Sequence, residues 1–242
     1  MFGQKNQLLI SVIIPTLDEE QNIASLLASL AKLDGVEIIV CDGGSSDSTL
    51  EICRSFPVRL LCSPMGRGVQ LNAGAQCAQG EILFFLHADS MIENRVLDDI
   101  RNVVAQGNLW GCCTLEFNER NWAFRAIAYF SNLRSRAFSS CYGDQGIYCQ
   151  RDLFWSKGGF PDIIVLEDME FSHLLRRHQR ARVVDGRIMT STRRFRAAGI
   201  VKTIAKMQMI KILYALGMKP EMLRTWYGSG EQEKKCEQQW LL

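Results

Sequence analysis

An apolar segment that ends abruptly at an acidic residue constrains this chain more than any other feature. Residues 82–86, Ile-Leu-Phe-Phe-Leu, predict a strand buried on both faces, and His87-Ala88-Asp89 follows it directly. The same pattern occurs earlier, where residues 36–40 run into Cys41-Asp42. Open α/β sheets bind ligands at the carboxyl ends of their strands. Two carboxylates at such positions suggest a nucleotide and a metal ion sharing one crevice.

The first hundred residues alternate between strand and helix patterns. Asp18 is expected to cap the first helix and Pro15 to end the first strand. This rhythm predicts an α/β fold with a mostly parallel, twisted sheet and helices on both faces. Strands are expected over 8–14, 36–40, 58–61 and 82–86, and helices over 20–33, 47–53, 66–78 and 93–105.

The second half of the chain is less regular. Its helix over 122–138 is rich in aromatic residues and carries three arginines. With 242 residues and no internal repeat or linker, we expect one domain over 1–228 and a polar tail over 229–242. Further strands are expected over 110–117, 145–149, 182–185 and 187–192, and further helices over 167–177, 199–216 and 221–227.

Composition restricts the partners and the compartment. The net charge of +2 does not indicate a nucleic-acid partner, and the nine cysteines form no C-x-x-C pair. With no signal peptide, a reduced cytoplasmic setting is expected, and no apolar run is long enough to span a bilayer. Residues 186–220 contain arginines and lysines but no acidic residue. Such a block is a solvated face, or it binds phosphates or anionic lipid.

Two common nucleotide-binding classes lack their signatures here. Dinucleotide binding needs a glycine fingerprint after the first strand, where this chain has Pro15-Thr16-Leu17-Asp18. No P-loop motif occurs either. Asp42, followed by two glycines, can accept hydrogen bonds from a base or a ribose, but it can equally close its own loop.

Taken together, the motifs resemble family 2 glycosyltransferases of the GT-A fold. The closest likeness is to a short bacterial subgroup associated with radical-SAM and selenium-domain proteins, and it covers roughly residues 8 to 227. The motifs that carry it are Ser11-Val12-Ile13-Ile14-Pro15-Thr16-Leu17-Asp18-Glu19, Asp42-Gly43-Gly44-Ser45-Ser46-Asp47, Gly66-Arg67-Gly68, Asn72-Ala73-Gly74-Ala75, His87-Ala88-Asp89, Tyr142-Gly143-Asp144-Gln145-Gly146, Gly158-Gly159-Phe160-Pro161 and Leu166-Glu167-Asp168-Met169-Glu170.

The resemblance implies an inverting transfer of a sugar from a nucleotide-diphosphate donor to an acceptor hydroxyl. Asp42 would contact the base, and Glu19 with the backbone of Pro15, Thr16 and Leu17 would line the nucleoside pocket. Asp89 would bind Mg²⁺ or Mn²⁺ bridging the donor phosphates.

The chain departs from the family pattern at His87, where the family usually has Asp. A histidine there either hydrogen-bonds in the pocket, which we favour, or ligates Mn²⁺. The substitution also keeps open a protein of another class, a catalytically inactive sugar-nucleotide-binding or membrane-scaffold protein. A nucleotidyltransferase is disfavoured because that class needs basic residues directly after the first strand, where this chain has the acidic segment Thr16-Leu17-Asp18-Glu19.

The resemblance also assigns the catalytic and phosphate-binding residues. Asp168 would be the general base and Glu167 its supporting neighbour, although both could simply complement the dipole of their helix. Arg193 and Arg194 look like the basic pair that follows the base in this family and would bind the diphosphate, or they belong to a solvated basic face. Arg67 lies in a Gly-flanked loop before a helix, which is a good place to meet an anion. Asp144 and Gln145 would shape the acceptor side.

The segment 202–219 combines apolar residues at many helical angles with four lysines. Such a helix can lie in a membrane interface, or it can pack on the sheet or on a second copy in a homodimer. We hypothesise peripheral attachment at the inner face of the membrane, which would suit a lipid-linked acceptor.

Overall fold

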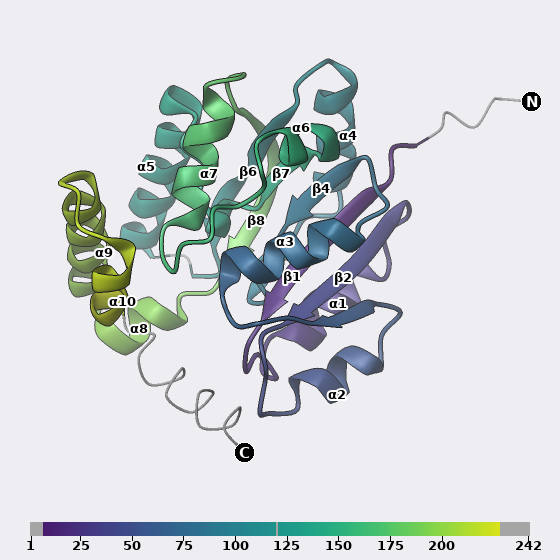
Figure 1. Cartoon of the computed structure of the whole chain (residues 1–242), viewed down its shortest axis with the longest axis horizontal. Coiled ribbons are helices and arrows are strands. Elements are labelled where there is room, and N and C mark those ends of the chain that lie inside the picture. The colour runs from purple at the N-terminus through teal and green to yellow at the C-terminus, as the bar shows by residue number, and fades with distance from the viewer. Residues whose placement is uncertain (1–6, 120, 228–242) are drawn as a thin grey trace, which may run out of the picture.

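The computed structural model describes residues 7–119 and 121–227, so the expected tail over 229–242 lies outside it. Strands and helices alternate through the first half of the chain, as expected (Figure 1). The elements of this half are β1 (Ile10–Thr16), α1 (Ile23–Leu30), β2 (Val36–Asp42), α2 (Thr49–Arg54), β3 (Arg59–Cys62), α3 (Arg67–Cys77), β4 (Ile82–Phe85), β5 (Ser90–Ile92) and α4 (Val96–Ala105).

The second half adds three strands and six α-helices among the described residues. They are β6 (Trp110–Phe117), α5 (Trp122–Phe138), β7 (Ile147–Gln150), α6 (Arg151–Ser156), α7 (Glu167–Arg176), β8 (Arg182–Thr190), α8 (Arg193–Ala198), α9 (Ile200–Ala215) and α10 (Pro220–Tyr227), with a 3-10 turn at Gly143–Gln145.

All eight described strands form one sheet in the order β3-β2-β1-β4-β7-β6-β8-β5. Neighbours pair in parallel in the β3-β2-β1-β4 half and at β6-β8, whereas β7 is antiparallel to both of its neighbours and β5 to β8. The predicted α/β class with a mostly parallel sheet is therefore confirmed. The carboxyl ends of β1, β2 and β4 meet at one edge, where the predicted site residues begin.

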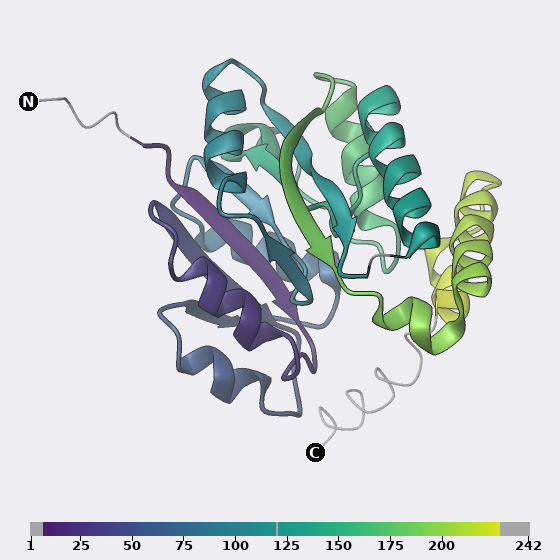
Figure 2. The same cartoon turned by 180° about the vertical axis from the view of Figure 1, so that it is seen from behind.

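Helices cover both faces of the sheet because its central strands are apolar on both sides. Ile10, Val12 and Ile14 of β1 pack into a core with α1 and α4. Ile13 points to the opposite face and packs into a second core with residues of α3, α6 and α7. The alternation follows from the two-residue period of a strand. Figures 1 and 2 show the two helical layers from opposite sides.

Three expectations about element ends are wrong. Pro15 does not end β1, which continues to Thr16 beside β2, although its pairing with β4 ends at Ile13. Proline is tolerated where one neighbour has already left the ladder. Strands expected over 182–185 and 187–192 are one strand, because Asp185-Gly186 forms a bulge against β6 rather than a turn. The helix expected over 20–33 begins only at Ile23.

Asp18 is also not the cap of α1. The residue preceding that helix is Asn22, whose side chain makes no capping bond. Asp18 instead has a φ of 52° and accepts hydrogen bonds from the backbone N–H and hydroxyl of Ser46. Its carboxylate therefore joins the β1–α1 loop to the β2–α2 loop.

The C-terminal helices form a separate small cluster at the side of the sheet. Ile210 of α9 and Leu223 of α10 are buried against Val165, in the loop before α7. Among the described residues, no helix is both long enough and apolar enough to cross a membrane.

Candidate functional site

The loop after β2 is closed by Asp42. The residue is 1% exposed, and its Oδ1 accepts hydrogen bonds from the hydroxyls of Thr16 and Ser45. Its Oδ2 accepts from the backbone N–H groups of Gly44 and Ser45, at 2.9 and 2.8 Å. These four bonds match the four lone-pair sites of a carboxylate. The loop-closing role that the sequence left open is thus present, and contact between Asp42 and a base stays a prediction.

Side chains of two other residues, Gln70 and Glu19, form hydrogen bonds or an ion pair near the end of β1. Gln70 of α3 donates from Nε2 to the backbone carbonyls of Thr16 and Cys41, at 2.9 and 2.8 Å. Glu19 accepts from Asn22 and forms a 3.3 Å ion pair with Arg193. Pro15 and Leu17 are half-buried on either side of buried Thr16.

Glu19 and Arg193 are 174 positions apart in the chain, and the structure brings them together. Contact of either residue with a nucleotide stays a prediction. The Arg193 side chain is half exposed, so part of its guanidinium can still meet an anion. The side chain of Arg194 lies outside the described part of the structure.

Asp168 stands at the start of α7 and is held from two sides. Its Oδ2 accepts a 2.7 Å hydrogen bond from the backbone N–H of Gly143, and its Oδ1 accepts one from Met169. His87, from the turn after β4, also lies close to Gly143, since a Cβ built on that glycine would be 2.6 Å from His87 Nε2 and 3.4 Å from Asp168 Oδ2. His87, Gly143 and Asp168 line one small pocket together with Arg67 and Glu167. Four separate segments of the sequence therefore converge on one point.

Glu167 is 2% exposed and forms a 3.0 Å ion pair with Arg67 at the start of α3. Burial raises the pKa of Glu167 above its ordinary value, Arg67 opposes that rise, and Asp168 adds to it. Removing the cationic partner of a buried carboxylate costs free energy, because it leaves an unpaired charge in the interior. Arg67 thus links the amino ends of α3 and α7.

The acceptor-side predictions fall on the turn before β7. Gln145 is fully buried, and its Oε1 accepts from Arg134 and Ser135 of α5. It can therefore influence a ligand only through its neighbours. Burial raises the pKa of Asp144, and its buried Oδ1 has no hydrogen-bond partner among the described residues.

Three residues of this region were not singled out from the sequence as site residues. Arg134 of α5 lies 3.5 Å from the ring centre of Tyr142, and Lys211 of α9 lies 4.3 Å from the same ring. Both are cation–π contacts. Tyr142 belongs to a quoted motif, but no sequence signal pairs it with a helix almost seventy positions later.

Asp89 occupies the turn between β4 and β5, where the N–H of Ser90 donates to the carbonyl of His87. It is half-buried. No group of three or more His, Cys, Asp or Glu residues among those described could hold a metal alone. Mg²⁺ is usually bound by one or two carboxylates together with substrate phosphates and water. A cation whose coordination the substrate completes would need only a carboxylate such as that of Asp89, and the role of Asp89 as its ligand stays a prediction.

The close approach of His87 to Gly143 yields a first prediction. An alanine Cβ at position 143 would lie 2.6 Å from His87 Nε2 and 3.4 Å from Asp168 Oδ2. Residue 143 or His87 must move because of the 2.6 Å contact, and a displacement near 1 Å of a group that positions a reactant costs roughly a hundredfold in rate. We expect Gly143→Ala to lower nucleotide-sugar hydrolysis by at least about tenfold, with little change in melting temperature.

The double variant His87→Ala with Gly143→Ala removes the clash and serves as the control. If the single variant hydrolyses the donor as fast as the unmodified protein, His87 and Gly143 do not define the pocket.

An α/β sheet with carboxylates at its strand ends and an acidic pair opening a helix is the arrangement expected from the resemblance to family 2 glycosyltransferases. The profile described as "Glycosyl transferase family 2" matches residues 11–152, more than half of the chain. The protein belongs to this family. The predicted membership of family 2 is confirmed.

The sequence of one relative supports this assignment to family 2. An uncharacterized glycosyltransferase of Haemophilus influenzae is 31% identical over 131 residues, which cover 47% of this chain and 52% of that protein. The chain thus spans about half the length of this relative.

Two solved structures share the fold. TarS 1–349 of Staphylococcus aureus in complex with UDP-GlcNAc matches with a TM-score of 0.60 at 22% identity, over 76% of this chain and 58% of that one. A mannosyltransferase of Pyrobaculum calidifontis in complex with GDP-Man and Mn²⁺ matches with a TM-score of 0.60 at 18% identity, over 93% of this chain and 70% of that one. At these identities the likeness establishes the fold.

Proposed function

We propose that this protein is an inverting glycosyltransferase that moves a sugar from a nucleotide-diphosphate donor to an acceptor hydroxyl, with a divalent cation. One observation carries the proposal. Asp168 opens α7 with its carboxylate held by Gly143 N–H, in the pocket that His87 reaches from the end of β4. Membership of family 2 and the nucleotide sugars bound by the two structural neighbours support it.

Asp168 takes the acceptor proton in this proposal. The acceptor oxygen attacks the anomeric carbon while its proton passes to Asp168, and the bond to the nucleoside diphosphate breaks on the opposite face. The Gly143 N–H and the amino end of α7 stabilise the negative charge of the base. Glu167 supports this arrangement by fixing Arg67 beside it.

Several groups would neutralise the negative charge of the departing diphosphate. Asp89 would hold Mg²⁺ or Mn²⁺, which neutralises the phosphate oxygens when bound. Arg193 is held beside the nucleoside pocket by Glu19, and with Arg194 it would contribute positive charge. Asp42 keeps the loop that lines this pocket in place.

The setting of the enzyme is part of the same proposal. We place it in the cytoplasm at the inner face of the membrane, as one GT-A domain over 1–228 in the radical-SAM-associated subgroup, acting on a lipid-linked acceptor. The alternative, an inactive sugar-nucleotide-binding or scaffold protein, rests on His87. Release of nucleoside diphosphate from UDP-GlcNAc or GDP-Man with Mn²⁺ separates the two, because only an enzyme turns the donor over.

Thermal stability in the presence of nucleotides provides the second prediction. A ligand that binds only the folded protein stabilises it by mass action, by about 2.7 kcal/mol at a hundredfold excess over its dissociation constant. We expect one of UDP or GDP, with Mg²⁺ or Mn²⁺, to raise the melting temperature by several degrees. The matching nucleoside monophosphate is the control and should stabilise less, because it lacks the second phosphate. If neither diphosphate shifts the melting temperature, the nucleotide-diphosphate donor is wrong.

A further inference from the structure

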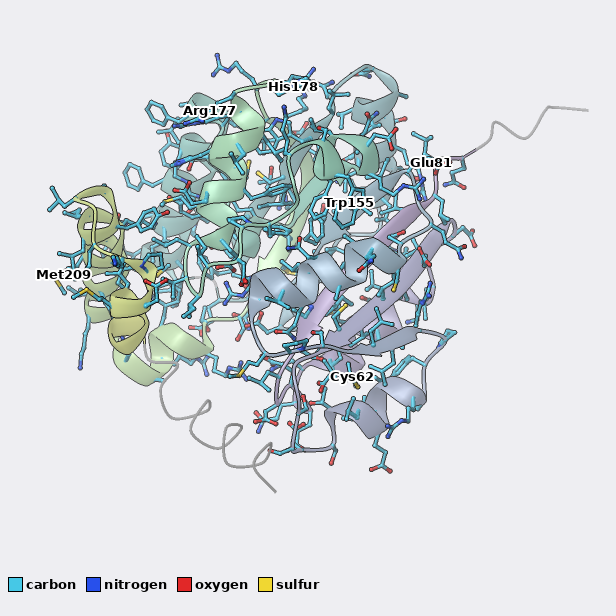
Figure 3. All side chains as sticks on the ribbon, in the orientation of Figure 1. Cys62, Glu81, Trp155, Arg177, His178 and Met209 are labelled. Atoms are coloured by element: carbon cyan, nitrogen blue, oxygen red, sulfur yellow. The ribbon has the colours of Figure 1, made fainter. Side chains whose placement is uncertain are left out.

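The outer surface of α9 is apolar. Val201, Met209, Ile212 and Leu216 recur at intervals that place them on one side of the helix, and Val201 and Leu216 are 81% and 79% exposed. Met209 lies on α9 at the edge of the molecule (Figure 3). The opposite side carries Ile210, which is buried against the loop before α7. A helix on the surface of a globular protein usually points its apolar side inward.

A second apolar surface runs along α5. Trp122, Tyr129 and Leu133 share one side of the helix and are exposed, with Trp122 82% exposed, and exposed Phe130 lies beside them. The other side of α5 is buried, with Phe124 packed against Phe117 of β6. The helix is therefore apolar on both its inner and its outer side.

The two surfaces belong to neighbouring elements. α5 and α9 lie on the same side of the molecule in both views (Figures 1 and 2). Arg134 of α5 and Lys211 of α9 contact the same Tyr142 ring, which joins the two helices across the turn before β7. We call the exposed apolar residues of the two helices together the α5–α9 surface.

The charge of these helices has a single sign. Neither sequence contains Asp or Glu, whereas between them they carry three arginines and three lysines, Arg125, Arg134, Arg136, Lys202, Lys206 and Lys211. Acidic side chains do reach three of these cations from elsewhere, since Asp185 lies 3.7 Å from Arg136 and Asp144 interacts with Arg134 and Lys211. Arg125, Lys202 and Lys206 remain as the cations beside the exposed apolar residues. Exposed aromatic and aliphatic residues flanked by cations match a bilayer interface, where apolar side chains enter the acyl boundary and cations meet anionic headgroups.

We propose that the α5–α9 surface docks the protein on a membrane containing anionic lipid. A two-fold homodimer through the same surface is disfavoured, because each copy would set its own cations against those of its partner.

The inner side of α9 connects this surface to the catalytic residues. Ile210 packs on Val165, and Leu166, which follows, has a φ of 66° and immediately precedes Glu167 and Asp168. A bulky residue at positive φ needs surrounding structure to hold it. The docking surface is thus the outer side of a helix whose inner side supports the base. Resting on the proposed function, this arrangement favours a lipid-linked acceptor.

Vesicle flotation tests the docking surface. We expect binding to phosphatidylcholine vesicles that contain phosphatidylglycerol at low salt, and weaker binding at high salt or to phosphatidylcholine alone. The double variant Trp122→Ala with Ile212→Glu should lose at least roughly tenfold in binding, because it removes apolar area that the bilayer would bury and adds a negative charge that anionic headgroups repel. Trp155→Ala is the matched control, because Trp155 is also exposed but lies on α6, away from the surface (Figure 3).

Several outcomes would overturn the docking surface. The first is that the unmodified protein does not float with anionic vesicles, and the second is that the double variant floats as well as the unmodified protein. The third is that the unmodified protein binds no vesicles and forms a homodimer that the double variant converts to a monomer. Stabilisation by nucleoside diphosphates and donor hydrolysis, measured without vesicles, report on the proposed function alone. The transfer reaction and the docking surface can therefore fail separately, whereas the membrane setting given with the proposed function fails together with the docking surface.

Discussion

Asp168→Asn is expected to lower the rate of donor hydrolysis and of sugar transfer by at least about a hundredfold, the usual contribution of a general base. The amide keeps the shape of the carboxylate and can still accept from Gly143 N–H. It cannot take a proton, so kcat should fall while binding of the nucleoside diphosphate barely changes. Steady-state kinetics of nucleoside-diphosphate release, together with the melting-temperature shift caused by nucleotide, measure the two effects separately.

Glu167→Gln is the control for that experiment, because it alters the adjacent carboxylate in the same helical turn. The amide can still accept from Arg67, so a smaller loss is expected. If Glu167→Gln were the more damaging change, the two roles would have to be exchanged.

Much of the fold could be predicted because it depends on local patterns. The apolar runs that became β1, β2, β4 and β6 are short, bounded by turn residues and buried, and the helices between them follow one another at regular intervals. β6 and α5 have the predicted bounds. The elements that were missed, β5, α6 and α8, have at most six residues. Elements this short depend on contacts from distant parts of the chain, which a local pattern does not contain.

The candidate site was predictable as a set of segments but not as a set of contacts. The motifs identified Arg67 and Glu167 separately, and only the fold shows them as an ion pair across a hundred positions. Other motif residues turn out to hold the framework. Asn72 exchanges two hydrogen bonds with the backbone of Phe160, and a side chain at Gly74 would collide with Ile13. A motif therefore marks a position that matters without saying whether it touches a ligand.

The orientation of α9 illustrates the same limit. Apolar residues at many helical angles left open whether the helix packs on the sheet or lies at a membrane. The fold shows that it packs through Ile210 on α10 and on the loop before α7 rather than on the sheet, while its other side stays exposed. Both properties coexist because only one side of a helix meets its neighbour.

Asp89→Ala is expected to abolish cation-dependent catalysis. Asp89 is the carboxylate in the turn after β4, and no cluster of three potential ligands exists among the described residues to replace it. In the unmodified protein Mn²⁺ should tighten the binding of a nucleoside diphosphate, because the cation bridges the carboxylate and the phosphates. In Asp89→Ala that tightening should vanish, and donor hydrolysis should fall by at least about a hundredfold, whereas nucleotide binding without a cation should be unchanged.

Calorimetric titration of the nucleoside diphosphate, with and without Mn²⁺, measures this difference directly. Asp34→Ala is the matched control, since Asp34 is exposed in the loop before β2, at the amino ends of the strands. Undiminished tightening by Mn²⁺ in Asp89→Ala would remove Asp89 from the cation site. His87→Ala then decides the alternative left open by the sequence. A histidine that only lines the pocket leaves the effect of Mn²⁺ intact, whereas a histidine that ligates the ion loses it with the ring.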